Sequence, residues 1–131
     1  MKISASAILV TACLASTAVM PGAQVTQVRG WLSDEQCARG RASGGVYTGT
    51  NPDCAKQCVA KGAKIVLIVP DQKQLLTVAN QDAARKNIGD YVDVTGDIDQ
   101  QSKTLHIDSL TMITQGRANC DRPSSKKSSQ Q

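Results

Sequence analysis

The sequence has few aromatic side chains and a single histidine. Its 131 residues include no Phe, one Trp and two Tyr. The hydrophobic core must therefore be built mainly from aliphatic side chains, and we expect it to be a light one. With His106 as the one histidine, and no serine beside it in a nucleophile motif, a catalytic triad has little support. We predict a protein that is not an enzyme, with no catalytic residues and no cofactor.

The sequence also lacks an apolar run long enough to cross a membrane. The apolar stretch Ile3–Val19 is too short and too rich in Ser and Thr for a span of about 20 consecutive apolar residues. Lys2 precedes this stretch and small residues follow it up to Ala23, which is the three-part pattern of a secretory signal peptide. We predict a signal peptide over residues 1–23, cleaved after Ala23 or after Ala18. The protein is then periplasmic or secreted, and it has no transmembrane span.

A lipoprotein is the alternative to simple cleavage. Residues 10–13 resemble a lipoprotein processing box, in which Cys13 would become the lipidated first residue. Against this, Cys13 comes early and the apolar run continues past it to Met20. Lipidation of Cys13 would tether the domain to a membrane surface without altering its fold.

Charge differs between the body of the chain and its end. The segment 24–116 contains ten Lys or Arg and ten Asp or Glu, so it is close to neutral, and the excess of positive charge lies in the segment 117–131. That segment is Ser, Lys, Gln and Pro with almost nothing apolar, so we expect a disordered, basic tail. The body, residues 24–116, is long enough for one domain.

Alternation of apolar and polar residues predicts five strands in the body. We place them at residues 24–32, 64–69, 74–79, 90–98 and 104–114. The second is a continuous aliphatic run and should be buried on both faces. In the fourth, Val92, Val94 and Ile98 share one face, and in the last Leu105 and Ile107 should point to the core.

Short helices are predicted between the strands. Ser33 and Gln36 have the spacing of a capping box, so a helical turn should run from Ser33 to Gly40. Asn51 and Pro52 are a good N-cap and first residue for a helix that continues to residue 61. Asn80 should cap a further helix over residues 81–88, which Gly89 ends.

The order of these elements matches a five-stranded oligonucleotide/oligosaccharide-binding (OB) barrel. We therefore predict a mainly β, OB-like barrel, with the cysteine-bearing helix inserted between the first two strands and another short helix before the fourth. Several short motifs also look familiar: Gly30-Trp31, Asp34 with Cys37, Cys54 with Cys58, Gly62-Ala63-Lys64, Ala79-Asn80-Gln81, Gly89 and Val94-Thr95-Gly96. Together, over about residues 30–113, they resemble a family of small exported bacterial proteins of unknown function. That resemblance implies an OB-like fold and no particular activity.

Four of the five cysteines lie after the predicted signal peptide, at Cys37, Cys54, Cys58 and Cys120. An even number in a small exported chain indicates disulfides, and four cysteines allow three pairings. Cys54 and Cys58 stand one helical turn apart and are poorly placed to bond each other. Each should find a partner elsewhere, with Cys37 and Cys120 as the available residues. A bridge from Cys37 into the helix would contribute about 3 kcal/mol.

A thiolate metal site is the alternative use of these cysteines. Cys37, Cys54 and Cys58, with His106 or Cys120, would suit copper(I) or zinc. The spacing lacks the close-set cysteine pairs of common zinc modules, and export favours oxidation. We therefore keep a thiol- or metal-handling protein as the second hypothesis.

Other polar groups have ordinary structural interpretations. Asp93, Asp97 and Asp99 lack the spacing of a calcium loop and are interpreted as solvated surface. The glycine-rich loop Gly40–Asn51 lacks the ending of a phosphate-binding loop, and Trp31 is interpreted as a core residue.

Nucleic-acid binding is not expected, because the body is neutral, the protein is exported and the second and third strands contain no aromatic residue. The leading hypothesis is a non-enzymatic binding or structural module of the cell envelope. It would contact an envelope protein or a small ligand through a strand face or through the loop Gly40–Asn51.

Overall fold

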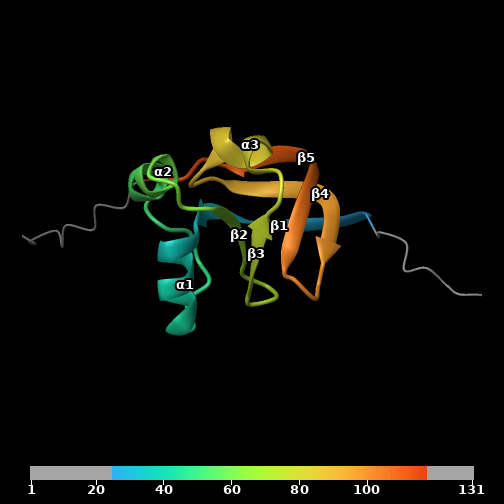
Figure 1. Cartoon of the computed structure of the whole chain (residues 1–131), viewed down its shortest axis with the longest axis horizontal. Coiled ribbons are helices and arrows are strands. Elements are labelled where there is room, and N and C mark those ends of the chain that lie inside the picture. Colours follow the sequence, from blue (N-terminus) through green and yellow to red (C-terminus); the bar gives the residue numbers. More distant parts are fainter. Residues whose placement is uncertain (1–24, 118–131) are drawn as a thin grey trace, which may run out of the picture.

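The computed structural model describes residues 25–117, and within them five strands close into a barrel (Figure 1). The strands are β1 (Val25–Asp34), β2 (Ile65–Val69), β3 (Gln74–Val78), β4 (Tyr91–Asp99) and β5 (Thr104–Thr114). They follow the order β1-β2-β3-β5-β4 around the barrel, and every neighbouring pair is antiparallel except the parallel pair β3–β5. The prediction of a small, mainly β, five-stranded barrel is confirmed. Its narrower assignment to the OB class stays a prediction.

The strand β2 is buried on both faces, as its continuous aliphatic sequence predicted. Its residues Ile65, Leu67 and Val69 belong to the core inside the barrel. Val66 and Ile68 alternate with them and pack outside the barrel in a second cluster under the first helix. The barrel therefore has an inner core and, on its outside, a smaller apolar patch that holds this helix in place.

The helix α1 (Glu35–Ser43) lies beside the barrel together with α2 (Pro52–Ala60) (Figure 1). The expected capping box at Ser33 is wrong. Strand β1 continues through Ser33 and Asp34, which pair with Val66 and Ile65. The Asp34 carboxylate instead caps the helix by accepting a hydrogen bond from the Cys37 amide. The helix also passes Gly40 and ends at Gly44, so the loop that follows is shorter than predicted.

The helix α2 begins as the sequence predicted. The side chain of Asn51 accepts hydrogen bonds from the amides of Asp53 and Cys54, and Pro52 is the first helical residue. Its buried residues Ala55 and Val59 join the inner core, so the helix covers one end of the barrel.

The helix predicted over residues 81–88 is shorter and is not capped by Asn80. It consists of α3 (Gln81–Ala84) and a 3-10 turn (Arg85–Asn87). The side-chain amide of Asn80 is hydrogen-bonded to β5 instead. Its Nδ2 donates to the Ile107 carbonyl and its Oδ1 accepts from the Ile107 backbone amide, both at 2.8 Å. The Gln81 side chain bridges Val78 and both backbone groups of Ile65 in the same way. These two side chains therefore take over backbone hydrogen bonding where the strands stop pairing.

The last strand, β5, is the longest in the sheet with 11 residues, and its neighbour β4 has 9. Val92, Val94, Leu105 and Ile107 are buried and face the inner core as predicted, and Ile98 packs against that core. His106 alternates with Leu105 and Ile107 and is exposed. Among the residues that the structure describes, no helix is long and apolar enough to cross a membrane.

Candidate functional site

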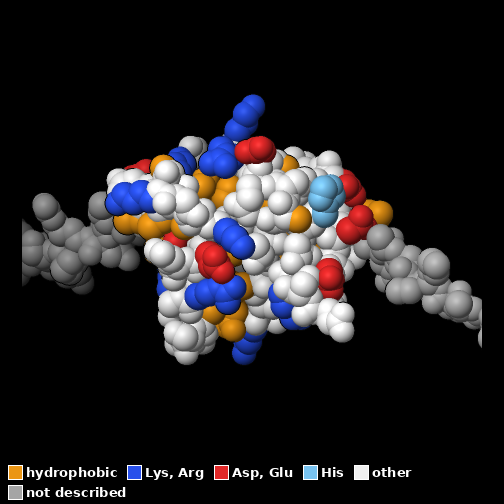
Figure 2. Space-filling model, viewed as in Figure 1, with side chains coloured by type: hydrophobic (Ala, Val, Ile, Leu, Met, Phe, Trp, Pro, Cys, Tyr) orange, Lys and Arg blue, Asp and Glu red, His pale blue; other side chains and the backbone are white. Residues whose placement is uncertain are grey.

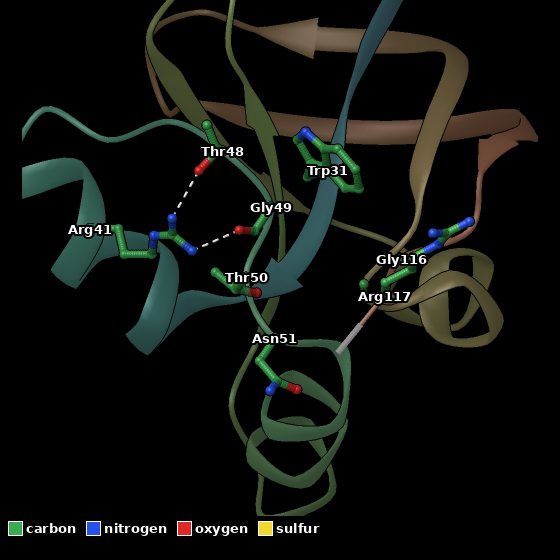
Figure 3. Close-up of a pocket in the computed structure, with 9 residues that line it drawn as sticks. Trp31, Arg41, Thr48, Gly49, Thr50, Asn51, Gly116 and Arg117 are labelled. Atoms are coloured by element: carbon green, nitrogen blue, oxygen red, sulfur yellow. Dashed lines mark hydrogen bonds between the residues drawn. The ribbon is translucent and has the colours of Figure 1, made fainter. Parts of the chain in front are cut away.

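A pocket of about 400 Å³ opens beside the end of β1, beneath the loop that joins α1 to α2 (Figure 3). Its walls come from four separate parts of the chain. They are Trp31, Arg41, Thr48, Gly49, Thr50, Asn51, Gly89, Gly116 and Arg117. The predicted contact loop Gly40–Asn51 thus supplies five of its lining residues.

The side chain of Arg41 fixes the loop that forms one wall. Its guanidinium donates to the carbonyl of Gly49 at 2.6 Å and to the hydroxyl of Thr48 at 2.8 Å. The neighbouring Thr50 hydroxyl is hydrogen-bonded to that of Ser33 at the end of β1. The loop is therefore held from α1 and from the barrel at once, although it contains no regular secondary structure.

The indole of Trp31 forms the aromatic side of the pocket. It is half-buried and packs against the outer apolar cluster. The centre of its ring lies 5.0 Å from the centre of the Tyr91 ring, and the planes of the two rings are inclined at 51°. Gly49 approaches it so closely that an added Cβ would lie 2.8 Å from two ring atoms. Trp31 is therefore not the buried core residue that was interpreted from the sequence: it packs against the outer apolar cluster and lines the pocket.

The far wall is formed where the chain leaves β5. The amide of Gly116 donates to the Asp90 carboxylate at 2.9 Å, and a Cβ on Gly116 would overlap the carbonyl oxygen of Gly89. This contact holds Gly116 and Arg117 against the barrel. Of the predicted tail 117–131, only Arg117 is among the described residues, and the predicted signal peptide 1–23 lies outside them.

The charge of the pocket differs from that of the rest of the domain. Arg41 and Arg117 lie on opposite sides of it, with Trp31 between them, and the lining contains no carboxylate (Figure 3). Elsewhere positive and negative side chains are interspersed, as on the face in Figure 2. Sequence reasoning named the loop Gly40–Asn51 but missed the two arginines of this site, because they are distant in the chain and the body is neutral overall.

Comparison with known proteins does not assign the chain to a family. No family model, curated protein or solved structure matches the chain. The resemblance to small exported bacterial proteins stays a prediction.

The cysteines that were expected to form disulfides or bind a metal lie in different environments. Cys37 and Cys58 lie together with Asp34, whereas Cys54 is exposed and outside this group. His106 is also outside it, and Cys13 and Cys120 are not among the described residues. Cys37, Cys54 and Cys58 are free thiols in the structure, so the disulfides stay a prediction.

The environment of Cys37 raises the pKa of its thiol to about 11. The main cause is desolvation by burial, and the negative charge of the nearby Asp34 carboxylate adds to it. A thiol with such a pKa is protonated at neutral pH and is a poor nucleophile. This arrangement does not support catalysis by Cys37.

The three aspartates of the last hairpin differ in environment: Asp93 and Asp99 accept hydrogen bonds, whereas Oδ1 of Asp97 is buried without a partner, so Asp97 is not the solvated surface residue expected from the sequence. Arg29 and Gln27 donate to Asp93 and lower its pKa, and the turn residues Gln101 and Ser102 donate to Asp99 and lower the pKa of that carboxyl. Among residues 25–117, none of these aspartates belongs to a group that could hold a metal ion.

Proposed function

We propose that this protein is an exported, non-enzymatic binding module that holds a small organic anion in the pocket beside Trp31. The single observation that carries the proposal is that two arginines and a tryptophan line one pocket whose lining contains no carboxylate. Export rests on the pattern of residues 1–23 and places the binding module in the periplasm or cell envelope, or outside the cell.

The shape of the pocket favours a ligand with a flat apolar part and an anionic group. A ring of the ligand can pack against the Trp31 indole, since aromatic rings gain from offset or tilted contact. A carboxylate can accept charge-assisted hydrogen bonds from Arg41 or Arg117, which are stronger than neutral ones. Arg41 uses two of its five N–H groups on the loop, so others are available to a ligand.

The test uses three probes of the same size and different charge: benzoate, benzamide and benzylammonium. Trp31 is the one tryptophan in the chain, so its fluorescence reports directly on the pocket. We expect benzoate to bind most tightly, with a Kd near 1 mM for so small a ligand, and benzylammonium to bind least. Equal affinity for all three probes would contradict the proposal.

Substitution of the arginines connects the binding to the site. Arg117→Gln removes one of the two guanidinium groups that line the pocket, and we expect benzoate affinity to fall about tenfold, which corresponds to one charge-assisted hydrogen bond. Arg41→Gln should have at least this effect, because it also releases the loop. Arg85→Gln is the matched control, since Arg85 is exposed, pairs with Asp82 and does not line the pocket. A loss of affinity in Arg85→Gln equal to that in Arg117→Gln would mean that only net charge matters.

Export is tested separately by the intact mass of the protein recovered from its producing cells. A mass that lacks residues 1–23 supports signal cleavage, and a lipid adduct on Cys13 supports the lipoprotein alternative. A full-length mass in the cytosol would contradict export without affecting the pocket.

A further inference from the structure

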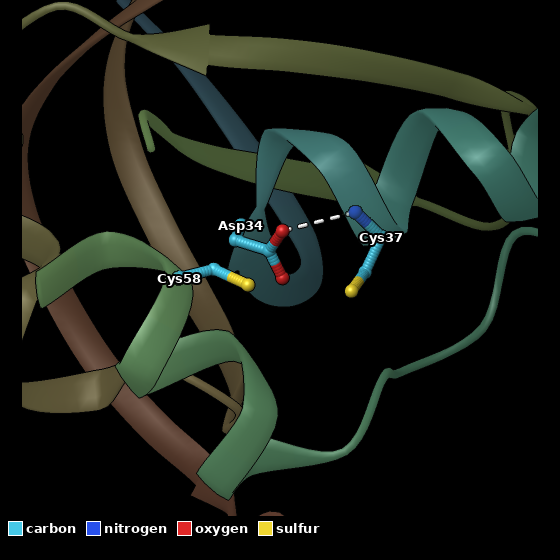
Figure 4. A group of neighbouring side chains, drawn as sticks. All are labelled: Asp34, Cys37 and Cys58. Carbon is cyan, nitrogen blue, oxygen red and sulfur yellow. Dashed lines mark hydrogen bonds between the residues drawn. The ribbon is translucent and has the colours of Figure 1, made fainter. Parts of the chain in front are cut away.

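The side chains of Asp34, Cys37 and Cys58 meet where α1 and α2 lie against the end of β1 (Figure 4). Asp34 is the N-cap of α1, Cys37 lies in the first turn of that helix, and Cys58 lies in the last turn of α2. One carboxylate oxygen and the two sulfurs all lie within 4.8 Å of one another. The grouping was not predicted, because Asp34 replaces Cys54 in the set expected from the sequence.

The Asp34 carboxylate has an unusual hydrogen-bonding state. The residue is completely buried, and its Oδ2 accepts the hydrogen bond from the Cys37 amide at 2.9 Å. Its Oδ1 is buried without any hydrogen-bond partner and points toward the two sulfurs (Figure 4). A buried carboxylate oxygen without a partner destabilises the fold, and more so when it is charged. Capping of α1 explains one oxygen and leaves the other without a role.

A cation would give this oxygen a partner. We propose that Asp34, Cys37 and Cys58 form a zinc site, with water in the remaining position. Zinc binds both thiolates and carboxylates, whereas copper(I) prefers soft ligands alone, so the buried carboxylate favours zinc. Tetrahedral zinc, with ligand bonds of about 2.0–2.3 Å, places its ligand atoms about 3.5–3.8 Å apart, a small adjustment from the observed grouping.

The two cysteines are suitably accessible for this role. Both are half-buried, so an ion can reach them from solvent while they remain shielded by α1 and α2. Binding replaces the two thiol protons, which are released to solvent. A disulfide between Cys37 and Cys58 would instead join the sulfurs and leave Asp34 Oδ1 without a partner.

The test measures zinc binding by the reduced, chelator-treated full chain, with cobalt(II) as a spectroscopic probe. We expect one equivalent of metal, a thiolate-to-cobalt absorption band, and release of protons on binding. Cys37→Ser, Cys58→Ser and Asp34→Asn should each weaken zinc binding at least about tenfold. Asn is as good an N-cap as Asp, so Asp34→Asn removes the charged ligand while it keeps the cap of α1.

Cys54→Ser is the matched control, because Cys54 lies one turn before Cys58 on the same helix and is exposed. It should leave zinc affinity unchanged. Loss of binding in Cys54→Ser, full binding in Cys37→Ser, or recovery of the protein with a Cys37–Cys58 disulfide and no capacity for zinc would each overturn the proposal. Arg117→Gln, which tests the anion pocket, should not alter zinc affinity, so the two proposals can fail independently.

Discussion

The side-chain hydrogen bonds of Asn80 should contribute more to the free energy of unfolding than those of a typical surface amide. The barrel closes through the parallel pair β3–β5, whose register covers only Thr77 with Thr104 and Val78 with Leu105. Beyond that point the Asn80 side chain takes the place of a strand and bonds both backbone groups of Ile107. Asn80→Ala removes both bonds and opens no large cavity, so its cost reports on this closure.

The magnitude follows from the number of bonds that are lost. Each intact bond contributes about 0.5–1.5 kcal/mol, and a partly buried backbone group left without a partner costs about 1–3 kcal/mol if water cannot reach it. Because the site is only partly buried, we expect the sum to fall at about 2–3 kcal/mol. That is a large fraction of the total of about 5–15 kcal/mol for a domain.

The assay is urea unfolding of both proteins, followed by the fluorescence of Trp31. Asn87→Ala is the control, since Asn87 makes one side-chain hydrogen bond, to Asp90, away from the contact between β3 and β5. Asn80→Asp is informative as well, because it keeps the acceptor for the Ile107 amide and loses the donor to the carbonyl. A cost below about 0.5 kcal/mol for Asn80→Ala, or a cost equal to that of Asn87→Ala, would refute the reasoning about closure.

Three further perturbations test other parts of the structure. Gly49→Ala should destabilise the domain by about 1–3 kcal/mol and shift the fluorescence of Trp31, because the new Cβ would lie 2.8 Å from the indole; an unchanged emission spectrum would contradict this contact. The pKa of Cys37 is raised from 9.0 to about 11, so the folded protein holds the thiol proton more tightly, and the free energy of unfolding should fall as pH rises from 9 to 11. Urea titrations of Cys37→Ser should lack that part of the fall. Arg29→Gln should raise the pKa of Asp93 in an NMR titration but barely change the urea midpoint, since the Arg29 side chain is 62% exposed; a large loss of stability would show that the pair is structurally important.

The features that could be predicted from the sequence are those determined by residues adjacent in the chain. The aliphatic run of β2 signals burial on both faces wherever it is placed, and Asn51 followed by Pro52 begins a helix by local geometry. The cap of α1 was expected at Ser33, but pairing with β2 extends β1 through Asp34, so Asp34 is the cap. The sequence alone could not decide between them.

The candidate sites were less predictable because they depend on the closure of the barrel. The loop Gly40–Asn51 was expected to be a contact surface, but Arg117 reaches the pocket only because Gly116 packs on Gly89. Likewise, the cysteine positions indicated paired thiols, yet the contribution of Asp34 depends on how the two helices meet. Polar groups distant in the sequence cannot be assigned to one site until the register of the strands is known.

The central claim is that the pocket beside Trp31 binds a small anion, and amide chemical shifts on addition of benzoate test it most directly. We predict that the shifts concentrate on residues 48–51, Gly89, Gly116 and the Trp31 indole. A second, separate pocket lies on β1, β4 and β5 and is lined by Arg29, Asp93 and Ser109 among others. Shifts confined to that pocket, or the same pattern with benzylammonium, would contradict binding beside Trp31.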